Sequence, residues 1–399
     1  MSALHLAWRT VRRYRAQTLL AIAGVAVIGA LLFDMLLLSR GLLLSFADLL
    51  ERAGYDVRIV GGGGMTLRMP IPGSAGIADT LRGLPEIETV ALVRILPARV
   101  AGRNGTSVSA ALIGVSGAAS GVWTIVRGVD LDRASGEPCP VIVGRTLADA
   151  LHAAPGDDVR ITAEPAGVRS ALPPIVCRVA GVGQFAFGGA GDETVATTLE
   201  ALHRASGEDR AGDADLILAR SRADAGAAAA VAAIQRARPG LAVYSNDEVL
   251  EQFNRNGFAY FRQISLVLSS LTMVFAFLLV ATLLTVSVNQ RLGEIAALRA
   301  IGIGRRRVAA MLLWESALLV GVGGLLALPL GELLALGLDR ILRQMPGLPE
   351  QLHFFVFEPR ALAVHVAVLV VTAVAAAAYP MWVTSRLPIA ATLRREVVG

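Results

Sequence analysis

Residues 264–307 read ISLVLSSLTMVFAFLLVATLLTVSV (residues 264–288) followed by NQRLGEIAALRAIGIGRRR (residues 289–307), and this stretch decides the fold. The first part carries no charged residue and is longer than the roughly 20 residues with which an α-helix crosses a hydrocarbon core. The second part is rich in arginine and too short to form a domain. We therefore predict a membrane-spanning helix that leads into a short basic hinge.

The composition of the whole chain is that of a membrane protein. Its 399 residues are 54% hydrophobic, with a mean hydropathy of +0.60, whereas soluble domains are about 45–50% apolar. Four stretches are long and apolar enough to cross a bilayer, namely residues 19–39, 264–288, 308–336 and 361–383. The ordinary polarity of residues 40–263 predicts an extracytoplasmic domain, and residues 337–360 form a second outer loop. The expected fold class is a membrane α-helical protein with four transmembrane helices and a large α+β extracytoplasmic domain inserted between helices 1 and 2.

The distribution of arginine predicts the orientation in the membrane. Arginine is concentrated in residues 1–18, in the hinge at residues 289–307 and in the tail at residues 384–399, where the only acids are Glu294 and Glu396. Basic residues in short loops are retained in the cytoplasm. We therefore expect both termini and the hinge to be cytoplasmic. The net charge of +5 suits membrane lipids with anionic headgroups, and we expect no nucleic-acid partner.

Residues 1–18 are predicted to form an amphipathic elbow helix on the cytoplasmic face of the membrane. A cleaved signal peptide is the alternative, because a basic region precedes an apolar one. However, the apolar run contains Asp34, no small-x-small cleavage site follows it, and its length of about 20 residues exceeds the 7–15 of a signal peptide. We predict that this segment is retained as the first membrane helix.

The inserted domain alternates β-rich runs with helical runs. Its predicted strands are residues 56–60, 89–95, 108–115, 141–144, 158–162, 175–182, 215–219 and 241–244. Its predicted helices are residues 77–84, 145–152, 199–205, 223–238 and 247–263. The last of these helices is expected to continue into the second membrane span.

The sequence argues against catalysis by this chain. The glycine run at residues 61–64 is not followed by Gly-Lys-Ser/Thr, and the chain contains no lysine at all. A P-loop needs that lysine on the β- and γ-phosphates. The sequence also has no Gly-x-Ser-x-Gly and no His-Glu-x-x-His. We expect a non-catalytic subunit with no cofactor of its own, in which the glycine run is a flexible loop.

At this point five segments resemble a known family. The hinge at residues 290–302, QRLGEIAALRAIG, resembles the signature of FtsX-like permeases, the ABC-transporter family that contains the macrolide exporter MacB and the lipoprotein-releasing permeases. The N-terminal segment at residues 6–15, the glycine-rich run at residues 315–331 and the closing box at residues 379–394 are also similar to parts of this family. The segment at residues 143–159 looks like part of its periplasmic core domain. The resemblance covers the chain in order, although the inserted domain matches only in patches.

The resemblance implies a permease subunit of an ABC transporter in a bacterial inner membrane. A separate cytoplasmic ABC ATPase, which holds ATP and Mg, would supply the energy to export or extract an amphiphile such as a lipid, a lipoprotein, or a macrolide-like or haem-like molecule. Further implied partners are a second permease copy, as a homodimer or heterodimer, and a periplasmic adaptor. The alternative is a mechanotransmitter that regulates an extracytoplasmic cell-wall hydrolase. The large inserted domain favours transport.

Within the hinge, the resemblance implies a contact with the ATPase. The residues concerned are Glu294, Ile295, Leu298, Arg299, Ala300 and Gly302. Leu298 would be the apolar knob of this contact, and Gly302 would stop the helix. The triplet at residues 305–307 is read as a topology signal.

The outer ends of the first two spans suggest a substrate pocket. Its candidate residues are Asp34, Met35, Phe258, Tyr260, Phe261 and Met273. Asp34 lies about 22 Å into the first span at 1.5 Å per residue, where a carboxylate is costly and tends to be functional or paired. Pairing with Arg40 or Arg262 is the structural alternative, and the aromatic residues are alternatively interface anchors.

The two cysteines, Cys139 and Cys177, both lie in the inserted domain. Because a periplasm is oxidising, they are a candidate disulfide. Two cysteines without nearby histidines are too few for a structural zinc site, so we expect no metal.

Overall fold

The computed structural model describes residues 5, 8, 12–13, 15–61, 69–116, 122–134, 136–164, 172–189, 191–207, 213–257, 259–290, 292–342 and 352–386. The chain divides into two compact units. The helical unit comprises Met1–Leu42, Phe258–Arg340 and His353–Gly399. The α+β unit comprises Leu43–Gly257 and Ile341–Leu352. Each unit is described by itself.

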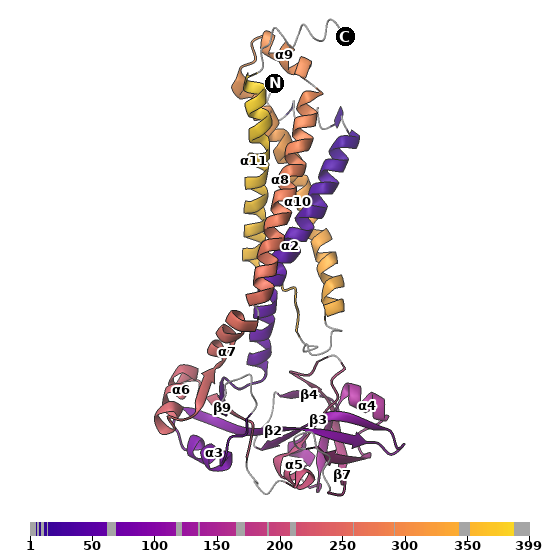
Figure 1. Cartoon of the computed structure of the whole chain (residues 1–399), viewed down its shortest axis with the longest axis vertical. Coiled ribbons are helices and arrows are strands. Elements are labelled where there is room, and N and C mark those ends of the chain that lie inside the picture. Colours follow the sequence, from indigo (N-terminus) through magenta and orange to yellow (C-terminus); the bar gives the residue numbers. More distant parts are fainter. Residues whose placement is uncertain are drawn as a thin grey trace. The chain divides into compact units, whose positions relative to one another are not determined.

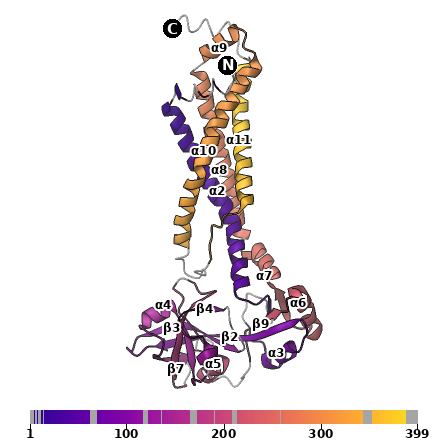
Figure 2. The same ribbon diagram turned by 180° about the vertical axis from the view of Figure 1, so that it is seen from behind.

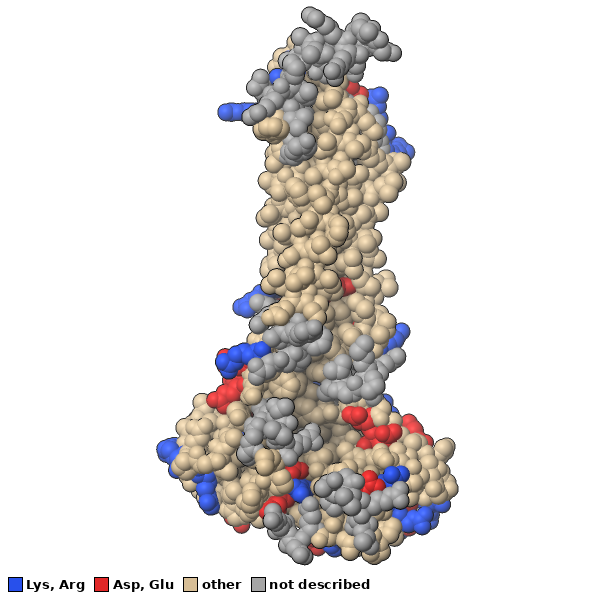
Figure 3. Space-filling model, viewed as in Figure 1, with Lys and Arg blue, Asp and Glu red and all other residues tan. Residues whose placement is uncertain are grey.

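Four long helices carry the apolar spans (Figure 1). They are α2 (Arg15–Arg52), α8 (Ala259–Asn289), α10 (Arg305–Leu342) and α11 (Pro359–Arg386). The most apolar 18-residue windows of these helices have mean hydropathies of 2.4, 2.5, 2.0 and 2.4. The surface of the helical unit shown in Figure 3 is almost free of charged side chains along its middle part. The prediction of four apolar helices, with an α+β domain inserted between the first and the second, is confirmed. The chain is therefore a multi-pass membrane protein.

Small residues let the helices approach closely, as is common in membrane bundles. A Cβ atom added to Gly323 of α10 would lie 2.7 Å from the Cβ of Val25 in α2. A Cβ at Gly29 of α2 would lie 2.9 Å from the Cβ of Ala327 in α10. A Cβ at Gly24 would meet the end of the flexible Leu279 side chain of α8, at 2.7 Å. Backbone proximity at Gly29 and Gly323 thus brings α2 against α10, and Gly24 gives room to a side chain of α8.

Polar side chains inside the bundle make hydrogen bonds between helices. The Ser316 hydroxyl of α10 donates to the Ala373 carbonyl of α11 at 2.9 Å. The Ser287 hydroxyl of α8 donates to the Glu315 carboxylate of α10, also at 2.9 Å. Glu315 is buried, so its observed role is in packing.

The α+β unit is built on a ten-stranded sheet of described residues with the order β10-β1-β9-β2-β3-β8-β5-β7-β4, and β6 pairs with β2 and β7. The strands are β1 (Val57–Val60), β2 (Ile87–Ala101), β3 (Ser107–Ser116), β4 (Trp123–Gly128), β5 (Pro140–Gly144), β6 (Asp158–Ala163), β7 (Ile175–Phe185), β8 (Thr194–Thr198), β9 (Leu216–Ser221) and β10 (Ala242–Ser245). The β3–β8 and β5–β7 pairs are parallel, and the other pairs are antiparallel.

The two faces of this sheet differ. One face packs against the helices α3 (Ser74–Arg82), α4 (Arg145–Leu151), α5 (Leu199–Ser206) and α6 (Gly226–Ala237), some of which are visible against the sheet in Figure 2. Because side chains alternate along a strand, neighbouring residues form a separate cluster on the opposite face. That cluster includes Tyr55, Val93, Trp123, Phe185 and Leu218.

The predicted strands of the domain are all present, with shifted ends, and two further strands were missed. The missed strand β4 contains Thr124, Ile125 and Val126, whose β-branched side chains were a readable signal. The missed strand β8, TVATT, is almost wholly buried, so it shows no alternation of polar and apolar residues.

The last predicted helix of the domain, residues 247–263, is not one regular α-helix. Helix α7 (Asn246–Gln252) begins at a capping box formed by Ser245 and Glu248, because each side chain accepts from the other's backbone N–H. A π-helical turn, η3 (Phe253–Gly257), follows it, and α8 begins at Ala259. Of the glycine run at residues 61–64, only Gly61 lies within the described residues.

A disulfide joins Cys139 to Cys177, with the two Cα atoms 4.6 Å apart. Cys139 precedes β5 and Cys177 lies in β7, and both are buried in the cluster under α4 and α5. The bridge therefore closes a 38-residue separation within the sheet.

We expect replacement of both cysteines by alanine to lower the stability of the α+β unit by about 2–4 kcal/mol, because the unfolded chain regains the entropy that the bridge removed. Denaturant unfolding followed by the fluorescence of the buried Trp123 measures this change. The matched control is the same measurement under reducing conditions, in which the wild-type and double-alanine proteins should have equal free energies of unfolding. An unchanged unfolding midpoint in the double variant under oxidising conditions would contradict the expectation.

Gly321 and Gly323, both in α10, provide a matched test of helix packing. A Cβ at Gly323 meets the Cβ of Val25 at 2.7 Å and the Ile22 carbonyl oxygen at 3.1 Å, whereas a Cβ at Gly321 meets no atom within 4 Å. We expect Gly323→Ala to lower the melting temperature, since overpacking costs about 1–3 kcal/mol. Gly321→Ala should keep or raise it, since alanine favours a helix by about 1 kcal/mol. Thermal melting in a single detergent compares the two, and equal melting temperatures would count against the packing.

Candidate functional site

The hinge folds as a short helix, α9 (Leu292–Ala300), between α8 and α10. The helix stops where Gly302 takes a φ of +94°, in the left-handed region that glycine adopts readily. The backbone N–H of Ile301 still donates to the Ala297 carbonyl at 3.1 Å, and that of Gly302 donates to the Arg299 carbonyl at 3.1 Å. The turn that follows leads directly into α10 at Arg305. Gly302 therefore has the backbone conformation expected of a helix stop.

One face of α9 is fastened to the adjoining ends of α8 and α10. Ile295 is only 5% exposed and packs in a cluster with Val288 of α8 and with Val308 and Leu312 of α10. Ile303 and Met381 pack against this cluster. The cluster therefore holds α9 against the adjoining ends of α8 and α10.

The other face of α9 is open to solvent. Ile301 is 78% exposed, the largest exposure among the large hydrophobic side chains described. The Oε1 atom of Glu294 lies 3.7 Å from a guanidinium nitrogen of Arg13. Because both side chains are exposed, this ion pair contributes little stability. Ile301 and Glu294 thus give the hinge one apolar and one charged exposed side chain.

The structure changes the roles of the predicted hinge residues. Ile295 was predicted to touch a partner, but its side chain is enclosed by α8 and α10, so it holds α9 in place. The side chain of Leu298, the predicted knob, lies outside the described residues. Arg299 is partly buried, and Ala300 is exposed. Ile301 was missed, although an isoleucine directly before the stopping glycine was a signal for it.

Of the predicted substrate-pocket residues, Met35 and Met273 lie together. They line a groove of about 300 Å³ between α2 and α8, together with Ser265 and Ser269. The hydroxyl of Ser265 is buried and has no hydrogen-bond partner among the described residues. Phe258 and the side chains of Tyr260 and Phe261 lie outside the described residues.

Asp34 does not line this groove. It is 0% exposed, and neither of its carboxylate oxygens has a hydrogen-bond partner in the described part of the chain. The side chains of Arg40 and Arg262, its expected partners, are outside the described residues. An unsatisfied carboxylate inside a membrane bundle is costly, so Asp34 stays a candidate functional residue.

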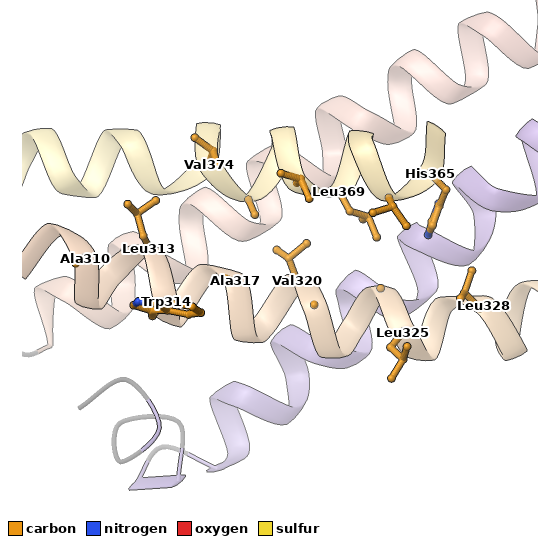
Figure 4. A pocket seen from close by; sticks show the side chains of 15 residues that line it. Ala310, Leu313, Trp314, Ala317, Val320, Leu325, Leu328, His365, Leu369 and Val374 are labelled. Atoms are coloured by element: carbon orange, nitrogen blue, oxygen red, sulfur yellow. The ribbon is translucent and has the colours of Figure 1, made fainter. Parts of the chain in front are cut away.

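A second groove, of about 530 Å³, runs between α10 and α11 (Figure 4). Its lining is apolar, with Leu313, Trp314 and Leu369 along it and His365 at one end. The His365 ring packs edge-on against Phe33 of α2, with 5.3 Å between ring centroids. Both of its ring nitrogens lack hydrogen-bond partners among the described residues. This groove can accommodate a hydrocarbon chain.

Four apolar spans, an inserted α+β domain and a packed basic hinge define a class of membrane permeases. Two family models match the chain: the MacB-like periplasmic core domain over residues 18–237 and the FtsX-like permease C-terminal region over residues 266–389. The first alone covers more than half of the chain. The protein therefore belongs to the FtsX-like ABC transporter permeases with a MacB-like periplasmic core domain, which confirms the resemblance. Membership of this family implies an ATPase partner.

Known relatives share parts of the chain. Over 134 residues it is 34% identical to an uncharacterized ABC transporter permease protein of Mycobacterium tuberculosis, a match that covers 33% of this chain but only 15% of that protein. The periplasmic region of MacB from Actinobacillus actinomycetemcomitans aligns with a TM-score of 0.39 and 13% identity, over 52% of this chain and 96% of that one. The extracellular domain of the ABC-type transporter YknZ from Gram-positive bacteria aligns with a TM-score of 0.33 and 14% identity, over 48% and 99% of the two chains.

Ile295 in α9 and Ile301 in the turn after it test the buried and the exposed side of the hinge. We expect Ile295→Ala to cost about 2–4 kcal/mol of stability, because it leaves a cavity among buried side chains. Ile301→Ala, a change of the same residue type on the exposed side, should stay within about 0.5 kcal/mol. Melting of the two purified variants compares them. The packing of α9 would be refuted by a tolerated Ile295→Ala.

Proposed function

We propose that this chain is the membrane subunit of an ABC transporter, in which α9 receives force from a separate cytoplasmic ATPase. The observation that supports this proposal best is the pairing of two features in the hinge, one in α9 and one in the turn that follows it. Ile295 clamps α9 to α8 and α10, while Ile301 projects into solvent at its end. A helix held on one side and exposed on the other is suited to passing movement from a partner into the bundle.

The energy must come from that partner. The chain has no lysine and therefore no P-loop, so ATP and Mg bind to the ATPase and not here. A push on α9 moves the ends of α8 and α10 together through the Val288–Ile295–Val308 cluster. The close contacts of Gly24 with α8 and of Gly323 with α2 then carry the movement along the bundle.

Charge supports a cytoplasmic position for the hinge in a bacterial inner membrane. Arg12 and Arg13 before α2 are exposed, as are Arg306 and Arg307 at the start of α10. Short basic segments of this kind stay on the cytoplasmic side during insertion. Both termini then lie inside, and the α+β domain lies outside.

The surface of α8 supports a second permease copy. Only 11% of the residues in its most apolar window are buried, against 33–44% in the other three spans. Its exposed side chains include Leu266, Val267, Leu271 and Phe275. We place the partner copy against this face of α8, in a homodimer or heterodimer. A periplasmic adaptor is a further candidate partner on the outer side.

The substrate proposed here is an amphiphile, such as a lipid, a lipoprotein, or a macrolide-like or haem-like molecule. The α2–α8 groove combines the apolar Met35 and Met273 with the serine residues Ser265 and Ser269. Such a lining suits a molecule with a hydrocarbon part and a small polar group. Movement of α8, driven through α9, would change the width of this groove.

The Ile301 position tests the coupling. When the chain is purified from its native membrane, an ATPase subunit should co-purify with it and hydrolyse ATP in the presence of Mg. Ile301→Glu should lower this activity at least about tenfold, the effect of losing about 1.4 kcal/mol of binding. Ile301→Leu should keep it, because the apolar contact survives.

Val126→Glu is the control, since it places the same charge on an exposed apolar position of the α+β unit. The proposal fails if Ile301→Glu retains full activity, or if the permease hydrolyses ATP in the absence of any other chain. Retained ATP hydrolysis without transport, together with a captured cell-wall hydrolase, would favour the regulatory alternative.

A further inference from the structure

The sheet face that the helices leave open contains a pocket of about 230 Å³. Its floor consists of apolar side chains from three adjacent strands, Val93 of β2, Ile113 of β3 and Leu218 of β9. Phe185 and Phe187 contribute aromatic surface on one side. This lining alone predicts affinity for hydrocarbon.

One guanidinium group adds a positive charge to this mostly apolar lining. Arg58 of β1 lines it and is 8% exposed. Its neighbours Val57 and Ile59 are in the core on the opposite face, so strand alternation directs Arg58 toward the pocket side. Buried charges are usually paired with an opposite charge, and an arginine in an apolar pocket therefore calls for an anion.

The structure does not fully supply that anion. The Arg58 guanidinium donates to the side-chain carbonyl of Asn246, which is neutral. Asp56 supplies a negative charge nearby, but its two oxygens accept from the backbone N–H and the hydroxyl of Ser221 and not from Arg58. Burial lowers the pKa of Arg58 to about 10, and Asp56 partly offsets this shift. Arg58 thus stays charged at neutral pH in an environment poor in water.

The other acid at the pocket does not compensate for Arg58. Asp192 lines the pocket from an exposed loop, and its carboxylate accepts from the backbone N–H of Gly189 at 2.7 Å. Tyr55, which also lines the pocket, has charges of both signs nearby: the Arg220 guanidinium is 5.6 Å from the centre of its ring, and Asp132 acts on the same side chain. Of the two charged side chains that line the pocket, Arg58 is therefore the buried one.

We propose that this pocket binds the anionic end of an amphiphile, with a carboxylate or phosphate on Arg58 and the adjoining hydrocarbon over Val93, Ile113 and Leu218. The volume is below the roughly 300–1,000 Å³ of pockets that enclose a drug-sized ligand, so it takes one end of a larger molecule. Oxyanions pair well with guanidinium because two N–H donors can meet two oxygens. Binding here does not depend on the proposed function; only the identification of this ligand with the transported substrate does.

Photo-crosslinking of the full-length chain in phosphatidylcholine nanodiscs tests the site. The probes are a twelve-carbon fatty acid with a diazirine in its chain and the alcohol of the same length. Mass spectrometry then measures the labelling of peptides from β2, β3 and β9. The carboxylate probe should label these peptides at least about tenfold more than the alcohol, as expected for a hydrogen bond to a charged group.

Four variants make the result specific. Arg58→Gln should reduce labelling by the carboxylate probe about tenfold, while Arg58→Lys, which keeps the charge, should retain most of it. Ala111→Trp, which fills the pocket without changing its charge, should abolish labelling by both probes. Arg160→Gln, at an exposed arginine of β6 that does not line the pocket, should behave as the wild type.

Equal labelling by the acid and the alcohol would overturn the proposal, as would wild-type labelling in both Arg58→Gln and Ala111→Trp. If Arg58→Gln fails to fold, the comparison of Arg58→Lys with Ala111→Trp decides the question. If the pocket peptides are labelled specifically but Ile301→Glu keeps full ATP hydrolysis, only the coupling proposal is contradicted. If Ile301→Glu lowers ATP hydrolysis but the pocket peptides are not labelled, only the pocket proposal is contradicted.

Discussion

The hydrocarbon core of the membrane is the constraint on which the rest of this structure depends. Because an unpaired backbone N–H or C=O is costly there, each crossing is a helix that satisfies its own backbone groups. Most charged side chains lie near the ends of the spans for the same reason, and the buried Asp34 and Glu315 are exceptions. The short basic hinge connects two such helices, and its helix α9 is held by the packing of Ile295 against Val288 and Val308.

Within the bundle, lipid is as apolar as leucine, so burial of apolar surface alone does not bring helices together. Contact depends instead on shape and on hydrogen bonds. Gly323 and Gly29 allow α2 and α10 to touch, and the hydroxyls of Ser287 and Ser316 link neighbouring helices. Tight contacts of this kind respond to a push at one end by moving together. The bundle is thus closely packed at these points, while most of the apolar window of α8 stays exposed.

Much of the fold was readable from the sequence, because the bilayer fixes the length of a span and alternation marks a half-covered strand. Strand β8 escaped because TVATT is buried on both faces and shows no alternation. In the hinge, the role of Gly302 followed from local backbone geometry. The roles of Ile295 and Ile301 did not, because the buried face is chosen by Val308 and Leu312, which come from the next helix. The Arg58 pocket was also hidden, since its walls come from strands far apart in the sequence.

The central claim is that α9 is a cytoplasmic receiver of force from another protein. Labelling of an Ile301→Cys variant with a membrane-impermeant maleimide tests this claim most directly, because Cys139 and Cys177 are bridged and do not compete for the reagent. The account predicts labelling in inverted membrane vesicles, none in intact cells, and protection when the ATPase is co-expressed. Labelling of intact cells, or equal labelling with and without the ATPase, would contradict it.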